Sequence, residues 1–268
     1  MGYKTHPIFD KIRRDTEIWR YIDLTKLLWI LQEEKLHFHL LAEFEEDNFE
    51  GTLPRATRDA ARVSLEESDN IADNKILGLL NHSQDAARNL SQVNCWHAKD
   101  GESAAMWKLY SSSGRGVAIK STVGNLMDSL SESKTDVYIS PVRYVDFYKK
   151  WDELSDSDRE ILNELFMKSE GRNLLQNAVL KRKEFSHENE IRAITTDFDN
   201  ITDTGNGSGS FQNLSINPKE LIDAIVLSPN MPHWAKITIE NTIQDLDSGP
   251  DIDSIQESRM ATENPGFN

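Results

Sequence analysis

The segment "CWHAKDGESAAMWKLYSSSGRGVAIKST", residues 95–122, decides the fold that we expect. Its first residues complete the strand-like run "QVNCW", and its last residues, "GVAIKST", also have the character of a strand. Between them, "ESAAMWKLY" has the spacing of a short helix, and "SSSGRG" is typical of a turn. Helices and strands are therefore both expected in this part of the chain.

Strand and helix patterns continue on both sides of this segment without regular alternation. Strands are predicted at 17–24, 36–41, 137–148, 188–196 and 221–229. Helices are predicted at 25–36, 54–90, 155–185 and 232–244, and a Gly- and Ser-rich surface loop at 199–213. We predict an α+β fold with a mixed sheet of short strands and several helices packed around it. One domain is expected over residues 1–247, with a core at about 18–244 and a loosely attached tail at 248–268.

Composition narrows the class of protein. The chain of 268 residues has a formal net charge of −15, which argues against an extended nucleic-acid surface. Its single cysteine excludes an intrachain disulfide and a cysteine-rich zinc site. The sequence has no apolar signal core at its start and no apolar run long enough to span a membrane. We therefore expect a cytoplasmic protein without a membrane partner; composition does not indicate an oligomeric state.

Two aromatic-rich segments contain candidate ligand-binding residues. Arg20 stands between Trp19 and Tyr21 on the first long predicted strand, where a guanidinium can stack on a ring and bind a phosphate or carboxylate. On the predicted helix at 102–110, one side carries Glu102 and Tyr110 and the neighbouring side carries Trp107. These side chains could hold a planar ring. The alternative is an ordinary rim ion pair for the arginine and ordinary core for the aromatics.

The segment "KRKEFSHENEIRAI", residues 181–194, is rich in charged residues and overlaps a predicted strand. If its second half is a strand, Glu188, Glu190 and Arg192 point to one face. Neighbouring carboxylates raise each other's pKa and an arginine lowers it, so the two glutamates can divide acid and base roles. The alternative is an exposed strand face covered with salt bridges.

Other groups are weaker candidates. The acidic turn "FEEDNFEG", residues 44–51, could present Asp47 and Glu50 to a cavity or a cation. Cys95 and His97 lie two apart on a strand, a spacing that does not make a nucleophile–base pair. Four histidines are candidate metal ligands, but their spacing matches no closed zinc pattern. They are His37, His39, His97 and His187. We predict no metal-binding residues.

Four of these motifs, taken in order, resemble a large bacterial family of uncharacterised proteins. They are an Arg-Tyr strand, a "DxFEG"-type acidic turn, "CW…ESxAMWxxY…GVAI" and a late "ExExR" strand. The resemblance spans roughly Ile18 to Gln244 and implies kinship without a known activity.

The chain also resembles, less closely, ADP-ribosyltransferases of the arginine–serine–glutamate type. That resemblance implies that Arg20 holds NAD as substrate and that Glu190, in "HENEI", is the catalytic glutamate, with Glu188 orienting or activating the acceptor. The Ser-Thr-Ser motif of that family has no clear counterpart here.

The leading hypothesis is an enzyme that binds NAD or another nucleotide. Its catalytic residues would be Glu190 and Glu188, and its ligand-binding residues Arg20, Tyr21, Glu102, Trp107, Tyr110 and Arg192. One alternative is a non-enzymatic interaction module, in which these side chains share no cavity. Another is a metal-dependent nuclease that uses the carboxylates Asp47, Glu50, Glu188 and Glu190.

Overall fold

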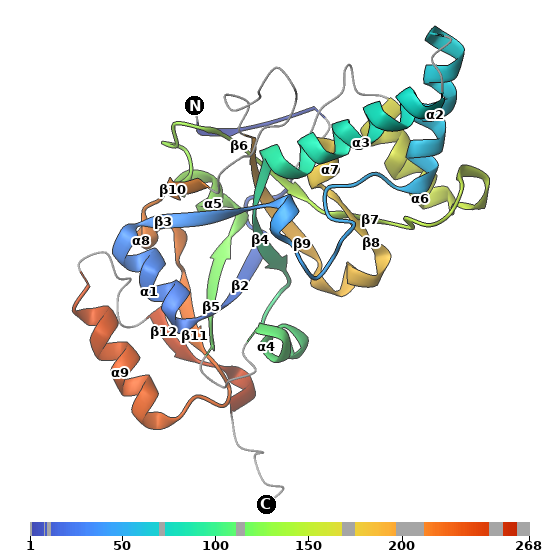
Figure 1. Cartoon of the computed structure of the whole chain (residues 1–268). Coiled ribbons are helices and arrows are strands. Elements are labelled where there is room, and N and C mark those ends of the chain that lie inside the picture. The colour runs from blue at the N-terminus through green and yellow to red at the C-terminus, as the bar shows by residue number, and fades with distance from the viewer. Residues whose placement is uncertain are drawn as a thin grey trace, which may run out of the picture.

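A computed structural model describes residues 2–7, 9, 12–69, 73–110, 116–167, 175–196, 212–246 and 254–261. Its centre is a mixed sheet in the order β1-β6-β9-β4-β2-β5-β11-β12, and β4 also pairs β3, which in turn pairs β10 (Figure 1). The strands are β1 (Gly2–Lys4), β2 (Glu17–Asp23), β3 (Lys35–Leu40), β4 (Ser91–Ala98), β5 (Gly116–Thr122), β6 (Asp136–Pro141), β9 (Glu190–Thr196), β10 (Gln212–Ser215), β11 (Ala224–Leu227) and β12 (Ile255–Glu257). Most neighbours are antiparallel, whereas β1 with β6 and β11 with β12 are parallel. The predicted α+β class is confirmed.

Helices cover both faces of this sheet (Figure 1). They are α1 (Leu24–Glu33), α2 (Arg55–Asp69), α3 (Asp73–Leu90), α4 (Ala104–Tyr110), α5 (Val123–Ser129), α6 (Asp156–Leu162), α7 (Leu175–Ala178), α8 (Pro218–Leu221) and α9 (His233–Gln244). Local capping marks two of their starts: the Asp23 side chain accepts a hydrogen bond from the Lys26 amide at the start of α1, and the Ser155 side chain accepts one from the Asp158 amide at the start of α6. Among the described residues, none of these helices is long and apolar enough to cross a membrane.

Two large apolar clusters lie on opposite sides of the central strands. One contains Ile18 and Trp96 together with residues of α1, α5 and α9. The other contains Val93, Ile194 and residues of α6 and α7. Successive residues of a strand point to opposite sides of the sheet, and this alternation is one of the patterns that predicted the strands.

The predicted long helix at 155–185 is wrong in its second half. Beyond α7 the chain forms β8 (Leu180–Arg182), which pairs in parallel with β7 (Arg143–Val145), and then a 3₁₀ helix, Lys183–Glu188. The reason is partly non-local: β7 pairs with this strand, and the ammonium group of Lys181 lies among the carboxylates of Glu188, Glu190 and the distant Glu50. Residues 168–174 of the predicted helix lie outside the described part.

The tail also differs from expectation where it is described. Residues Ile255–Glu257 form β12, which extends the sheet beside β11. The next residues bind Glu102, since the hydroxyl of Ser258 and the amide of Arg259 donate to its carboxylate. This part of the tail is attached to the sheet. The predicted loop at 199–213 lies outside the described residues except for Gln212 and Asn213, which begin β10.

Candidate active site

The site lies where the sheet opens along one edge of β4. At the end of β4, β2 pairs only through Ile18 with Ala98 and Trp19 with His97. At its start, β3 pairs only through His39 with Val93 and Leu40 with Gln92. The central residues of β4, 94–96, therefore lie outside both ladders on this edge. Because β2 stays paired with β5 as far as Asp23, it diverges from β4 and leaves a wedge-shaped opening.

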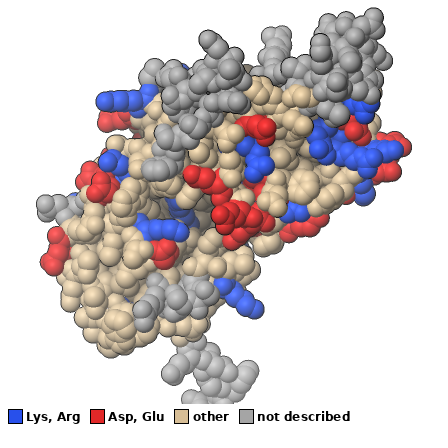
Figure 2. Space-filling model, in the orientation of Figure 1, with Lys and Arg blue, Asp and Glu red and all other residues tan. Residues whose placement is uncertain are grey.

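Three adjoining cavities follow this opening. A central cavity of about 190 Å³ is lined by Arg20, Tyr21, Cys95, His97, Tyr110, Glu188 and Glu190, among others. A second, of about 370 Å³, shares Tyr110 and both glutamates and is lined by further acids of the 43–50 segment. A third, of about 410 Å³, shares Arg20 and His39 and is otherwise apolar and basic, with Lys26, Trp29 and His37. We call the three together the cleft; Figure 2 shows acidic side chains gathered beside a hollow on this face.

Arg20 is the first residue of β2 beyond its pairing with β4. Its guanidinium lies 5.9 Å from the centre of the Trp96 ring, and Nη1 is buried without a hydrogen-bond partner. Among the described residues, no carboxylate forms an ion pair with Arg20, and burial lowers the pKa of Arg20 to about 10. Arg20 as a whole is half-buried, but its buried Nη1 donor lacks a partner, so this side chain is suited to an anionic ligand.

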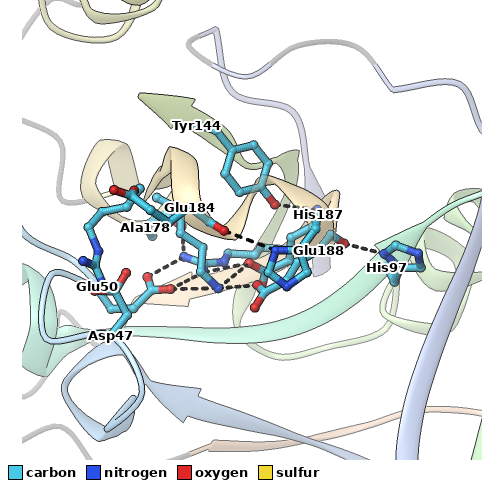
Figure 3. Close-up of polar contacts among 12 residues, drawn as sticks. Asp47, Glu50, His97, Tyr144, Ala178, Glu184, His187 and Glu188 are labelled. Carbon is cyan, nitrogen blue, oxygen red and sulfur yellow. Dashed lines mark hydrogen bonds and ion pairs between the residues drawn. The ribbon is translucent and has the colours of Figure 1, made fainter. Parts of the chain in front are cut away.

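Glu190, the first residue of β9, is held by two cations. Its Oε2 atom lies 2.9 Å from Arg192 Nη2 and 3.4 Å from Lys181 Nζ. Arg192 also binds Glu50 with two nitrogens, at 2.8 and 3.1 Å, and Lys181 lies 3.3 Å from Glu50. Figure 3 shows these contacts converging between Glu50 and Glu188, with Tyr144 beside them. The network fixes the Glu190 carboxylate at the wall of the cleft.

Glu188 and Glu190 share Lys181 but are in different electrostatic states. Lys181 Nζ lies 2.5 Å from Glu188 Oε2. Burial raises the pKa of Glu188, and Lys181 offsets that effect only in part. Burial also acts to raise the pKa of Glu190, but Arg192 and Lys181 outweigh it and lower that pKa to about 2. Such a separation suits one carboxylate that stays ionised and one that accepts a proton more readily.

Tyr21 and Tyr110 were predicted to bind ligand, and both line the central cavity. The Tyr21 hydroxyl accepts a hydrogen bond from the Ser103 amide, and burial raises its pKa to about 12. Tyr110, the last residue of α4, is 46% exposed. The partial burial of Tyr110 raises its pKa as well, so both residues that line the central cavity are neutral phenols.

Glu102 and Trp107 do not line any of the three cavities. The Trp107 indole donates to Glu102 at 2.8 Å, and Glu102 also accepts hydrogen bonds from Ser258 and Arg259. The Trp107 ring is buried against Tyr21, with ring centres 4.9 Å apart. These two residues thus attach the 254–261 segment and support the wall from behind. Arg192 is likewise fully buried, behind Glu190.

Sequence reasoning missed Lys181 and gave too little weight to His97 and Cys95. The register of β4 with β9 places His97 opposite Glu190 and Cys95 opposite Arg192, so these side chains share one face. The Cys95 thiol is hydrogen-bonded to Glu190, and burial raises its pKa, which keeps it a neutral thiol. The polar residues of the two strands could be recognised in the sequence. The register that brings His97 opposite Glu190 could not.

The alternatives fare differently against this geometry. Within the described ranges, no group of three or more His, Cys, Asp or Glu is arranged to hold a metal ion. Asp47 binds Arg182 at 2.8 Å and Glu50 binds Arg192, so cations of the protein already contact these carboxylates. The interaction-module alternative expects Arg20 and Glu190 to lie in no shared cavity, but they line the same one.

The fold and site define an α+β protein with a cleft between diverging strands, an arginine without a counter-ion and a pair of carboxylates. Comparison with known families matches residues 106–193, a third of the chain, to "Protein of unknown function (DUF2971)". This match confirms the predicted resemblance to an uncharacterised family for that part. A search of curated proteins finds no match.

Among solved structures, DarT from Thermus sp. 2.9, in complex with carba-NAD+, is similar to this chain. The alignment covers 93% of this chain and 98% of that one, with 9% sequence identity and a TM-score of 0.39.

Proposed function

We propose that this chain is a bacterial cytoplasmic enzyme that binds NAD, or a closely related nucleotide, and cleaves its bond between ribose and nicotinamide. The observation that carries the proposal is the meeting of Arg20, Glu188 and Glu190 in one cleft, with the pKa values of the two carboxyls shifted in opposite directions. An anion site beside a carboxylate pair matches a substrate that joins a phosphate to a reactive sugar.

In this proposal Arg20 binds a phosphate of the ligand. A phosphate supplies the missing negative charge, and the neighbouring apolar cavity, with Trp29, His37 and His39, offers surfaces for a ring. The wedge between β2 and β4 allows both parts of a dinucleotide to lie along the sheet edge.

Glu190 stabilises the transition state. As the ribose–nitrogen bond breaks, its electron pair passes to the nicotinamide nitrogen, and positive charge develops on the ribose carbon. An ionised carboxylate stabilises that charge, and Arg192 and Lys181 hold Glu190 ionised and fixed in position. Their charges also reduce its field, so the net stabilisation is smaller than for an unpaired carboxylate.

Glu188 then acts on the incoming oxygen. Water or another acceptor attacks the ribose carbon, and its proton passes to Glu188, whose raised pKa suits a general base better than that of Glu190. The products are nicotinamide and an ADP-ribosylated acceptor, or free ADP-ribose where water is the acceptor.

The test is to incubate the purified protein with NAD, measure nicotinamide release by chromatography and measure NAD binding by calorimetry. Glu190→Gln should reduce release at least a hundredfold while retaining binding, and Arg20→Ala should weaken binding at least tenfold. Glu184→Gln, on the neighbouring 3₁₀ helix, and Arg13→Ala, on the surface, are matched controls that should behave as the parent. If the parent protein neither binds nor cleaves NAD, or if the site variants match their controls, the proposal is wrong.

A further inference from the structure

His97 has a side chain that the steps above do not use. It lies near the end of β4, where it is paired in register with Trp19 of β2 on one side and Glu190 of β9 on the other. Its ring is only 5% exposed and lines the central cavity together with Arg20 and Glu190. Directly opposed residues of an antiparallel pair have their Cβ atoms about 5 Å apart, so the side chains of His97 and Glu190 leave neighbouring strands on the same face of the sheet.

The hydrogen bonding of His97 fixes which nitrogen carries the proton. Nδ1 lies 2.5 Å from the backbone oxygen of Glu188, a contact visible in Figure 3. A carbonyl oxygen only accepts, so Nδ1 is the donor. Burial lowers the pKa of His97, so the ring is neutral near pH 7, and Nε2 is left as an acceptor.

Nε2 is buried and has no hydrogen-bond partner among the described residues. Buried polar atoms in folded proteins are nearly always paired, and an unpaired one is unfavourable unless it serves a purpose. The wall next to it includes Met106, whose unbranched side chain can shift to admit a ligand group.

We propose that Nε2 of His97 accepts a hydrogen bond from a ribose hydroxyl of the sugar whose bond is cleaved. The inference rests on the proposed function and adds a residue that recognises the substrate. A neutral acceptor favours a hydroxyl over a phosphate, which carries negative charge and lacks a donor at neutral pH. The sugar, rather than the base, is the partner because the register places His97 beside Glu190.

His97 also has a positioning role through its other nitrogen. The Nδ1 bond holds the Glu188 carbonyl just before the left-handed turn at Asn189, whose φ is 38°. That turn leads directly into Glu190. The two nitrogens can be separated by substitution, because asparagine places a donor near the position of Nδ1 whereas glutamine places an acceptor near that of Nε2.

The experiment measures NAD binding and nicotinamide release for His97→Asn and His97→Gln. His97→Asn should weaken NAD binding about tenfold, because it retains the donor to Glu188 and loses the acceptor. His97→Gln should retain binding within about threefold and lose turnover. The same proteins are then tested with NAD lacking the 2′- or the 3′-hydroxyl of the nicotinamide ribose. One deoxy analogue should bind the parent about tenfold more weakly than NAD does, yet bind His97→Asn as well as NAD does.

The outcomes separate the two proposals. If the parent binds NAD and His97→Asn binds it equally well, the inference about His97 is overturned while the proposed function stands. Equal losses for NAD and both deoxy analogues in His97→Asn also overturn it, since the lost contact is then not to a hydroxyl. If the parent binds no NAD, the proposed function and this inference fail together.

Discussion

Arg192 and Glu50 form a two-pronged ion pair in which neither side chain is exposed to solvent. Nη2 lies 2.8 Å from Oε1 and Nη1 lies 3.1 Å from Oε2. The pair joins β9 to the acidic turn that follows β3, segments more than a hundred residues apart. Because Arg192 also binds Glu190, the same pair that stabilises the fold holds the candidate catalytic carboxylate.

The first prediction concerns the stability of this pair. Glu50→Gln leaves the buried Arg192 short of one counter-charge and should lower the free energy of unfolding by about 3 kcal/mol. Asp136→Asn breaks the exposed Lys4–Asp136 pair, 2.7 Å apart, and should cost less than about 1 kcal/mol. Urea denaturation of both variants measures the difference. Equal losses in the two would show that the buried pair has no special weight.

The second prediction concerns acid stability. Arg192 and Lys181 lower the pKa of Glu190 from an ordinary 4.5 to about 2, so the unfolded chain binds this proton more tightly than the folded one. The stability contributed by Glu190 is therefore complete above about pH 4.5 and is lost as pH falls toward 2. Glu190→Gln should remove that part of the pH dependence. The midpoint of urea unfolding, measured for both proteins across this range, checks it; parallel curves would contradict the assignment.

Much of the fold could be predicted from local patterns. The predicted strands at 17–24, 36–41 and 188–196 have alternating or β-branched residues, and the structure has β2, β3 and β9 there. The start of the third was wrong, because Glu188 ends a 3₁₀ helix and β9 begins only at Glu190. At residues 180–182 the spacing of apolar residues predicted a helix, but the structure has the short strand β8. The pairing with β7 and the ion pairs of Lys181 that stabilise this strand come from distant segments.

The site was predictable in its residue types and less so in its geometry. Arg20 and Glu190 were selected from sequence, and the structure brings them to one cavity. Glu102 and Trp107 were selected as an acid and an aromatic on one predicted helix, but α4 begins only at Ala104. Glu102 binds Ser258 and Arg259, and Trp107 packs on Tyr21. Helical spacing groups residues on a face but does not say which neighbour that face meets.

The third prediction uses the cation between the two glutamates. Lys181 lowers the pKa of Glu188, so Lys181→Met should raise that pKa further. If Glu188 is the general base, nicotinamide release falls as Glu188 becomes protonated, and the acid limb of the pH–rate profile should move to higher pH by about one unit. Lys183→Met removes a half-exposed lysine that binds Asp158, and it should leave the limb in place. An unmoved limb in Lys181→Met would assign that proton to another group.

The fourth prediction separates Glu102 from catalysis. Its carboxylate accepts hydrogen bonds from the Trp107 indole, the Ser258 hydroxyl and the Arg259 amide, and it lines none of the three cavities of the cleft. Glu102→Gln should therefore release the 254–261 segment, raising amide hydrogen exchange there at least tenfold, while nicotinamide release stays within about threefold of the parent.

The matched control is Glu257→Gln, which breaks an exposed ion pair to Lys236 on the same segment and should leave exchange nearly unchanged. The opposite result, lost cleavage with the segment still protected, would return Glu102 to the ligand-binding role that its sequence position suggested. Hydrogen exchange and nicotinamide release report on different parts of the sheet. The segment joins the sheet through the pairing of β12 with β11, and β5 and β2 lie between that edge and the carboxylates. Within the described part of the chain, strands β4, β2, β5 and β11 lie between β12 and β9, which carries Glu190.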